Sequence, residues 1–232
     1  MILSIITVVK DDLDGLLKTC SSIDEFVLGG GFEHIIWWNS SQSLENNKIP
    51  QKKYRQTYLG NDTGIFDAMN KSLQKCKGQF VLFLNARDTF ESVLYLDDLK
   101  NNPQPSLIKV KYKNYFGSEK FVSVKKNTKM GIPFCHQGML LERLKVHFPT
   151  DKKFSGDYVA FLDCKYEWPL KFLESGLIRY DTEGVSSINR WSSDMHTNAI
   201  IGSRFGIFWR LFHLLRSVSK VIVKKLYKIR KK

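Results

Sequence analysis

A carboxylate directly after a buried strand is the first group in this sequence that could do chemistry. The run Phe80–Leu84 is continuously apolar, as expected of a strand covered on both faces, and Asn85-Ala86-Arg87-Asp88 follows it at once. Ligands of open α/β sheets gather at the carboxyl ends of the strands. Asp88 at such a place could hold a divalent cation and, through it, a diphosphate.

The residues before this strand predict a loop, a helix and a tight turn. Asp62 lies in a Gly/Asn/Asp/Thr cluster suited to a loop and to a helix cap. Apolar residues then recur at spacings of three and four, which predicts a helix: they are Ile65, Met69, Leu73 and Cys76. A basic last turn precedes Gly78, which we expect to end the helix in a left-handed conformation.

The first sixty residues predict the opening of a doubly wound sheet. Ile2–Val9 is expected to be a buried strand, followed by an acidic turn at Asp11 and Asp12 and a helix with one apolar face. Two more strands are expected at His34–Trp38 and Tyr54–Leu59.

The second half of the chain is expected to add helices and a hairpin. A helix is predicted at Glu91–Lys100, and two hairpin strands at Leu107–Lys113 and Phe121–Lys125. Later come a helix after Ser155, expected to hold Trp168, and a strand at Gly176–Tyr180.

These motifs resemble those of a known family. GIFDAMNKSL, then KGQFVLFLN, then a short loop ending in Asp88, is similar to the core of the family 2 glycosyltransferases, especially bacterial members that build surface polysaccharides. The resemblance covers roughly the first 190 residues, strongly up to Asp88 and thinly afterwards. It implies an α/β fold of the GT-A type, a Rossmann-like, mixed but mainly parallel sheet flanked by helices, and an inverting transfer from a nucleotide sugar.

The resemblance also implies a set of donor-side residues. Family members place a divalent cation, Mn²⁺ or Mg²⁺, on the residue that matches Asp88. The other positions that it places around the donor are Thr7, Val9, Asn39, Asp62, Asp67, Asn70, Asn85 and Arg87. Thr7 and Val9 would lie near the nucleotide base, while Asp67 and Asn70 are more readily structural braces. Arg87 would either neutralise diphosphate or point to solvent.

Asn39 departs from the family, which usually has Asp there. An Asn can accept one hydrogen bond and also donate, but it lacks the charge that would hold a uracil or ribose. A plain Asn-Ser turn is the alternative interpretation of this position.

Two later stretches carry acceptor-side expectations. His136 and Gln137 match a Pro-x-x-His-Gln segment that lines the acceptor side in close relatives. A buried structural His is one alternative, and a thiol nucleophile at Cys135 is disfavoured because adjacent residues do not form a base–nucleophile bond. Asp157 matches the catalytic base of the family, although a carboxylate at a helix start is also stabilised by the helix dipole alone.

The last 29 residues carry ten of the thirteen excess positive charges of the chain, and no acidic residue follows Asp194. From residue 203 the apolar residues follow a helical period, with the basic residues expected on the opposite side. We therefore expect a GT-A domain at residues 1–202 and, at 203–232, a basic amphipathic helix that lies in an anionic membrane surface. A helix that packs on the domain or on a second subunit is the alternative.

Other bulk features limit the class of protein. The four cysteines show neither a CxxC pair nor zinc-like spacing, which indicates free thiols in a reducing cytoplasm. The N-terminus lacks the basic start of a signal peptide, and no apolar run approaches the ~20 residues of a spanning helix. The expected place is the cytoplasm, at the inner face of the cell membrane.

The sequence thus predicts a glycosyltransferase that uses a nucleotide sugar, with UDP as the expected nucleotide, and a saccharide or lipid-linked saccharide acceptor. A GT-A protein that binds a nucleotide sugar or partner proteins without turnover is the alternative, since Asn39 and Asn85 lack charge. A dinucleotide oxidoreductase is disfavoured because no Gly-x-Gly-x-x-Gly follows the first strand. Nucleic acid is not an expected partner, because a nucleic-acid arm needs no apolar face.

Overall fold

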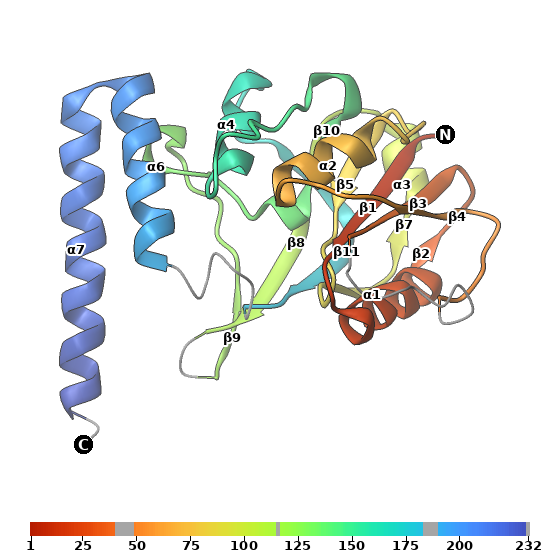
Figure 1. The fold of residues 1–232 in the computed structure, drawn as a ribbon, viewed down its shortest axis with the longest axis horizontal. Helices are drawn as coiled ribbons and strands as arrows, with labels where there is room; N and C mark the ends of the chain where they lie inside the picture. Colours follow the sequence, from red (N-terminus) through yellow and green to blue (C-terminus); the bar gives the residue numbers. More distant parts are fainter. Residues whose placement is uncertain (40–48, 115–116, 183–189, 231–232) are drawn as a thin grey trace.

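The structure is a computed structural model that describes residues 1–39, 49–114, 117–182 and 190–230, with the side chains of 190 and 220–230 left out. Its centre is a nine-stranded sheet in the order β4-β3-β1-β5-β10-β8-β11-β6, with β9 paired to β8. Figure 1 shows this sheet with helices around it and a pair of helices at one side.

Four parallel strands form the first half of the sheet. They are β1 (Leu3–Val9), β3 (Phe32–Trp38), β4 (Arg55–Leu59) and β5 (Phe80–Phe83). All four were expected from the sequence to within two residues. Helices α1 (Leu13–Phe26) and α2 (Ile65–Leu73) connect them.

Helices α1 and α2 cover opposite faces of these strands. Val9 and Trp38 pack with Leu16 of α1, whereas Val8 and Trp37 share a cluster with Met69 of α2. Because neighbouring residues of a strand point to opposite faces, this alternation puts one helix on each side of the sheet. The doubly wound arrangement expected from the sequence is therefore confirmed.

The second half of the sheet is mixed. β10 (Met139–Glu142) runs antiparallel to both β5 and β8 (Ser106–Lys113), and β11 (Lys171–Tyr180) lies parallel to β8 and antiparallel to β6 (Thr89–Ser92). The expected hairpin is present as β8 and β9, but its second strand is Glu119–Phe121 and not the predicted Phe121–Lys125. A second, two-stranded sheet pairs β2 (Val27–Leu28) with β7 (Leu94–Tyr95).

Three further expectations about local structure were wrong. The helix predicted at Glu91–Lys100 is confined to α3 (Leu96–Asn101), because the residues before it pair as strands β6 and β7. Helix α4 (Gly156–Asp163) ends before Trp168. Gly78 does not cap α2, which ends at Leu73. Its N–H instead donates to Ser4 Oγ at 2.9 Å, and a Cβ there would lie 2.5 Å from the backbone nitrogen of Ser4.

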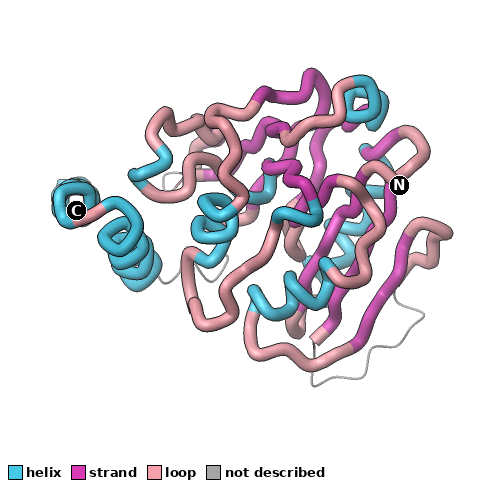
Figure 2. Tube along the Cα trace, turned by 90° about the horizontal axis from the view of Figure 1, so that it is seen from above, coloured by secondary structure: helices cyan, strands magenta, loops and turns pink. Residues whose placement is uncertain are grey.

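Two long helices complete the described chain. α6 (Arg190–Phe205) and α7 (Ile207–Arg230) are joined at Gly206, whose φ of +89° favours glycine. The two helices lie side by side, with α6 next to the rest of the molecule and α7 outermost, in both views (Figures 1 and 2). The amphipathic segment expected from residue 203 thus begins at Ile207. Among the described residues no helix is long and apolar enough to span a bilayer.

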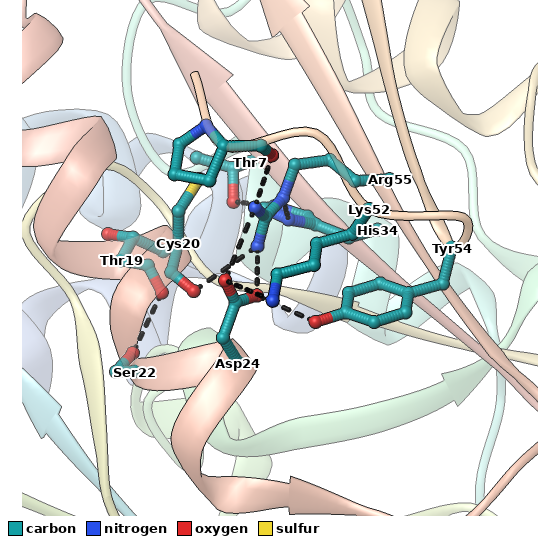
Figure 3. A network of polar contacts seen from close by, with 10 residues as sticks. Thr7, Thr19, Cys20, Ser22, Asp24, His34, Lys52, Tyr54 and Arg55 are labelled. Carbon is teal, nitrogen blue, oxygen red and sulfur yellow. Dashed lines mark hydrogen bonds and ion pairs between the residues drawn. The ribbon is translucent and has the colours of Figure 1, made fainter. Parts of the chain in front are cut away.

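A buried polar network ties the first strands to α1 (Figure 3). The Arg55 guanidinium forms an ion pair with Asp24 and donates to His34 Nδ1 at 3.0 Å, to Pro50 O and to Cys20 O. Since Nδ1 accepts, the proton of His34 is on Nε2, which lies 2.9 Å from Thr7 Oγ1. Complete burial, and then the charge of Arg55, lower the pKa of His34 well below its usual value.

Candidate functional site

The carboxyl ends of the parallel strands lie at one edge of the sheet and hold most of the predicted donor-side residues. Asn39 N donates to Val9 O at 3.0 Å, and Gly60 N donates to Trp38 O at 3.2 Å, so the ends of β1, β3 and β4 are adjacent. The loop that begins at Asn85 follows β5, the other neighbour of β1. This is the edge at which a nucleotide would be expected to bind.

Thr7 does not lie at a ligand surface. Its side chain is fully buried, and its hydroxyl donates to Leu84 O at 2.8 Å and contacts His34 Nε2. The geometry gives it a role in the core network, and a side-chain contact with a nucleotide base, as the resemblance implied, is not supported. Val9 is also buried, so only its backbone faces the end of the strand.

Asp62, Asp67 and Asn70 make bracing contacts around α2. Asp62 Oδ2 accepts from Trp37 Nε1 at 3.2 Å, and Asp67 Oδ2 accepts from the backbone N–H of Thr63 and from Lys71. Asn70 uses both ends of its amide: Nδ2 donates to Phe148 O at 2.7 Å and Oδ1 accepts from Phe148 N at 2.9 Å. Asn70 thereby links α2 to the segment that leads to α4.

Arg87 forms an ion pair with the start of α1. It has a left-handed φ of +77°, and its Nε donates to Asp12 Oδ2 at 2.7 Å. Asp12 is also the N-cap of α1, where its other oxygen accepts from Gly15 N at 3.0 Å. The pair therefore joins the loop after β5 to the start of α1. About half of the Arg87 side chain remains exposed.

Asp88 is almost completely buried. Its Oδ1 accepts from the backbone N–H of Asp181 at 2.9 Å, and the Gln137 side chain also bonds to its carboxylate. Burial raises the pKa of Asp88 to about 7, against the lowering effect of these hydrogen bonds and of His136. A nearby positive charge would therefore stabilise its ionised form strongly.

His136 and Gln137 connect the two predicted carboxylates. They lie in a single 3₁₀ turn, η3 (His136–Gly138), that packs against β5, β8 and β11. His136 Nδ1 lies 3.1 Å from Asp157 Oδ2, while Gln137 bonds to Asp88. Among the described residues His136 Nε2 is buried without a hydrogen-bond partner. The structure thus brings four predicted residues from distant parts of the sequence into one cluster.

Asp157 lies in the first turn of α4, with about a fifth of its side chain exposed. Burial pushes its pKa upward, but the hydrogen bond and charge of His136, together with the Tyr158 N–H, outweigh burial and lower the pKa. Asp157 is therefore ionised at neutral pH and able to accept a proton. Both the helix-start and the base interpretations remain compatible with this position.

Cys135 does not have the environment of a nucleophile. Its Sγ donates to Gln137 Oε1 at 2.8 Å, and burial raises the pKa of the thiol. The thiol instead orients the amide of Gln137, so that the NH₂ group of that amide is the part that bonds to Asp88.

Asp181 and Asp12 were not selected from the sequence. Asp181 follows β11, and the antiparallel pairing of β11 with β6 brings it next to Asp88. This pairing was hidden because the predicted helix at Glu91–Lys100 took in the last two residues of β6 and the first two were not assigned to any element. Asp12 was recognised only as part of a turn before a helix, and its contact with Arg87 joins residues 75 positions apart.

The residues around Asp88 fit a divalent cation that shares its ligands with a diphosphate. Asp88 and the neighbouring Asp181 supply carboxylates, and Asn85 Oδ1 is buried without a partner among the described residues. Oxygen atoms of these kinds suit Mg²⁺ or Mn²⁺, and Mg²⁺ often uses one or two carboxylates together with phosphate oxygens and water. Within the described ranges no group of three His, Cys, Asp or Glu side chains could hold a metal ion alone.

The comparisons with known proteins find relatives through structure. No family model matches the chain, and no curated protein sequence is similar to it. Among solved structures, S. aureus TarS 1–349 superposes with a TM-score of 0.58 at 14% identity, covering 86% of this chain and 65% of that one. The same protein in complex with UDP gives a TM-score of 0.59 at 15% identity, with the same coverage. In complex with UDP-GlcNAc it gives 0.51 at 14%, covering 88% and 66%.

The chain has the fold of TarS. The expected GT-A-like architecture, a mainly parallel sheet flanked by helices with further helices at the end of the chain, is therefore confirmed. At 14 to 15% identity the likeness to TarS establishes the fold alone. The chain spans about 65% of the TarS 1–349 chain.

Proposed function

We propose that this protein transfers a sugar from a nucleotide-sugar donor, with UDP as the nucleotide, to a saccharide or lipid-linked saccharide acceptor. The observation that carries the proposal is the η3 turn, which joins Asp88, at the diphosphate end of a GT-A-like sheet, to Asp157 through consecutive side chains. The complexes of TarS with UDP and UDP-GlcNAc support the choice of donor. The sequence motifs support a place in bacterial cell-surface polysaccharide synthesis.

Donor binding is assigned to the carboxyl edge of β1, β3 and β5. Asn39 lies there, bonded to the backbone of Val9, and Asn85 follows the end of β5 beside β1. A divalent cation held at Asp88, with Asn85 and Asp181 beside it, would offset the charge that grows on the diphosphate leaving group. Arg87 contributes positive charge to the same loop while its contact with Asp12 fixes the loop to α1.

Proton transfer is assigned to Asp157. A lowered pKa keeps this carboxylate ionised, and partial exposure lets an acceptor hydroxyl reach it. As the hydroxyl oxygen forms its bond to the anomeric carbon, Asp157 takes the hydroxyl proton and the bond to the diphosphate breaks. Attack from the face opposite the leaving group inverts the anomeric configuration, with no covalent enzyme intermediate.

The test is turnover by the purified chain. UDP release from UDP-GlcNAc and other UDP-sugars is measured with Mn²⁺ and saccharide acceptors, donor affinity is measured by calorimetry, and the anomeric configuration of the product by NMR. Asp157→Asn is expected to keep donor binding and lose turnover by ~10²-fold or more, the scale of general-base assistance. Asp163→Asn, an exposed carboxylate on the same helix, is the matched control and should turn over like the parent.

Two other results would change the assignment. Donor binding without turnover in the parent would indicate a nucleotide-sugar-binding protein that is not an enzyme. Turnover at the parent rate in Asp157→Asn would return Asp157 to a role at the start of α4.

A further inference from the structure

One side of α7 exposes a row of large apolar side chains. Their exposed fractions run from 38% for Val218 to 70% for Leu215. The set, called here the outer face of α7, comprises Ile207, Phe208, Leu211, Phe212, Leu215 and Val218. Spacings of one, three and four residues place them along one broad side of the helix. A contiguous apolar row of this size marks an interaction surface.

The other side of α7 packs on α6, and its buried members are polar. His213 is 5% exposed and Ser217 is 1% exposed. Trp209 is the large apolar residue of α7 that packs against Ile200 and Ile201, whereas the six residues of the outer face stay exposed. Packing on the domain alone would not require this exposed apolar row, because burying apolar surface is the main gain of packing.

Helix α6 connects this outer face to the candidate site. Ile200 and Ile201 pack against Tyr158 and Val159 of α4, the two residues that follow Asp157. On the other side of Asp157, Ser155 Oγ lies 2.7 Å from Thr197 Oγ1 of α6. The segment that carries the proposed base is thus held between its own domain and the helix on which α7 rests.

The charge of this region has one sign. The chain has no acidic residue after Asp194, and α7 contains Arg210, Arg216 and five further basic residues up to Arg230. A bilayer with anionic headgroups attracts such a segment while its interface accepts the apolar row. Two copies of this chain that met through the outer face would pair two helices that carry positive charge and no acidic residue, so no charge complementarity would hold them together.

We propose that the outer face of α7 docks in the interface of an anionic bilayer and that α6 holds Asp157 at a fixed position relative to that surface. The acceptor is then a saccharide carried on a lipid of the same bilayer. The acceptor part of this inference rests on the proposed sugar transfer, whereas the docking part does not.

The docking test is flotation of the full chain with vesicles. Phosphatidylcholine vesicles with and without phosphatidylglycerol are compared at low and high salt. The double variant L211S/L215S is expected to bind anionic vesicles ~10²-fold more weakly, because each Leu loses its burial in the interface. The matched control is F121S/L144S, which removes two exposed apolar side chains from elsewhere and should bind like the parent.

The flotation experiment can support or overturn the docking of the outer face of α7 on a bilayer. Binding that needs phosphatidylglycerol, weakens in salt and is lost only in L211S/L215S supports it. Equal flotation of the two double variants, or equal binding to neutral vesicles, overturns it. A parent that does not float, but forms a dimer that L211S/L215S abolishes, assigns the outer face to a second copy instead. Circular dichroism and thermal unfolding that match the parent show that each variant is folded.

The acceptor part is tested by rates on two kinds of acceptor. Saccharide acceptors are offered free in solution or linked to a lipid in anionic vesicles. L211S/L215S should keep the parent rate on the free acceptor and lose about tenfold or more on the vesicle-borne one. Equal rates on both overturn the acceptor part. If the parent transfers to no acceptor at all, the proposed function fails, and flotation still decides the docking.

Discussion

His136 and Gln137 show how two adjacent residues can serve two sides of one site. In a 3₁₀ turn, side chains one apart point in different directions, and here one contacts Asp157 and the other Asp88. Each carboxylate is thus oriented by its own neighbour, while the turn fixes the two relative to each other. A change at either residue should therefore affect one half of the reaction and spare the other.

Asp88→Asn is expected to abolish the gain in UDP affinity that Mn²⁺ gives the parent, with the fold intact. Asn can still accept the Asp181 N–H, but it has no charge with which to hold a cation. Calorimetry of UDP with and without Mn²⁺ measures this. Asp97→Asn, an exposed carboxylate on α3, should behave as the parent. An equal Mn²⁺ effect in Asp88→Asn and the parent would refute the metal assignment.

His136→Ala is expected to lower turnover by about tenfold or more with UDP affinity unchanged, because a hydrogen bond to a charged group contributes about 1.5–3 kcal/mol. His136→Asn should recover part of the rate, since its Nδ2 can replace the ring Nδ1 that contacts Asp157. Steady-state kinetics separate the two effects, and His147→Ala, at an exposed position, is the control. A rise in KM for the donor alone would show that His136 serves donor binding and not Asp157.

The residues of this cluster could be selected from the sequence only through motifs. Asp88 follows a buried strand, so its place at the sheet edge also follows from simple topology. The contact of His136 with Asp157, 21 residues apart, depends on how η3 and α4 pack, and no local pattern encodes it. For Thr7 the predicted place near the end of a strand was correct, but the sequence did not reveal that its side chain points into the core.

At the scale of elements, the sequence predicts those whose pattern is local and strong. The strands β1, β3, β4 and β5 are apolar runs between turn residues, and they were found to within two residues. Thr89–Ser92 was missed because its strand structure comes from pairing with β11, some 90 residues later. Gly78 was misassigned because its small size is required by the close approach of Ser4 and not by a helix end.

The network of Arg55 and His34 makes a testable contribution to the stability of the first strands. Burial and the charge of Arg55 keep His34 neutral in the folded state, so its folded pKa lies below the unfolded value of about 6.5. At about pH 6 the imidazole of His34 therefore binds a proton in the unfolded chain but not in the folded chain. The resulting stability is full above pH 6.5 and is lost as the pH falls below it.

We therefore expect the parent to lose stability relative to His34→Gln between pH 7.5 and pH 5.0, because glutamine cannot take up the proton. The raised pKa of Asp88 acts in the opposite direction over this range, but it is common to both proteins and cancels in the comparison. Denaturation by urea at both pH values measures the difference. His147→Gln removes an exposed imidazole and should keep the pH dependence of the parent. If His34→Gln keeps it too, the acid sensitivity comes from other groups.

At the scale of the whole molecule, the strand order of the second half of the sheet was not predictable. β10 enters between β5 and β8 and reverses the strand direction, and β11 returns parallel to β8. These pairings join segments separated by about 30 to 70 residues. The sequence carries no signal for them beyond the resemblance to the GT-A fold. The separation of the C-terminal segment into α6 and α7 was also not predictable, because the helical period of its apolar residues does not reveal the break at Gly206.

The break at Gly206 also determines which part of the chain the domain needs. Ile200 and Ile201 of α6 are buried against α4, whereas α7 meets the rest of the molecule mainly through α6. A chain that ends at Gly206 should therefore stay folded, bind UDP as the full chain does, and unfold within a few degrees of it, since about 1 kcal/mol shifts the midpoint of a domain this size by about 2–4 °C.

A chain that ends at Thr182 loses α6 as well and leaves Tyr158 and Val159 without their cover. Exposing these side chains and Phe154, whose ring meets that of His196, should lower the midpoint by ten degrees or more, on the order of several kcal/mol of lost burial. Thermal unfolding followed by circular dichroism compares the three chains. If the chain ending at Gly206 unfolds as early as the shorter one, α7 belongs to the stable core of the molecule, and its outer face cannot be separated from the fold.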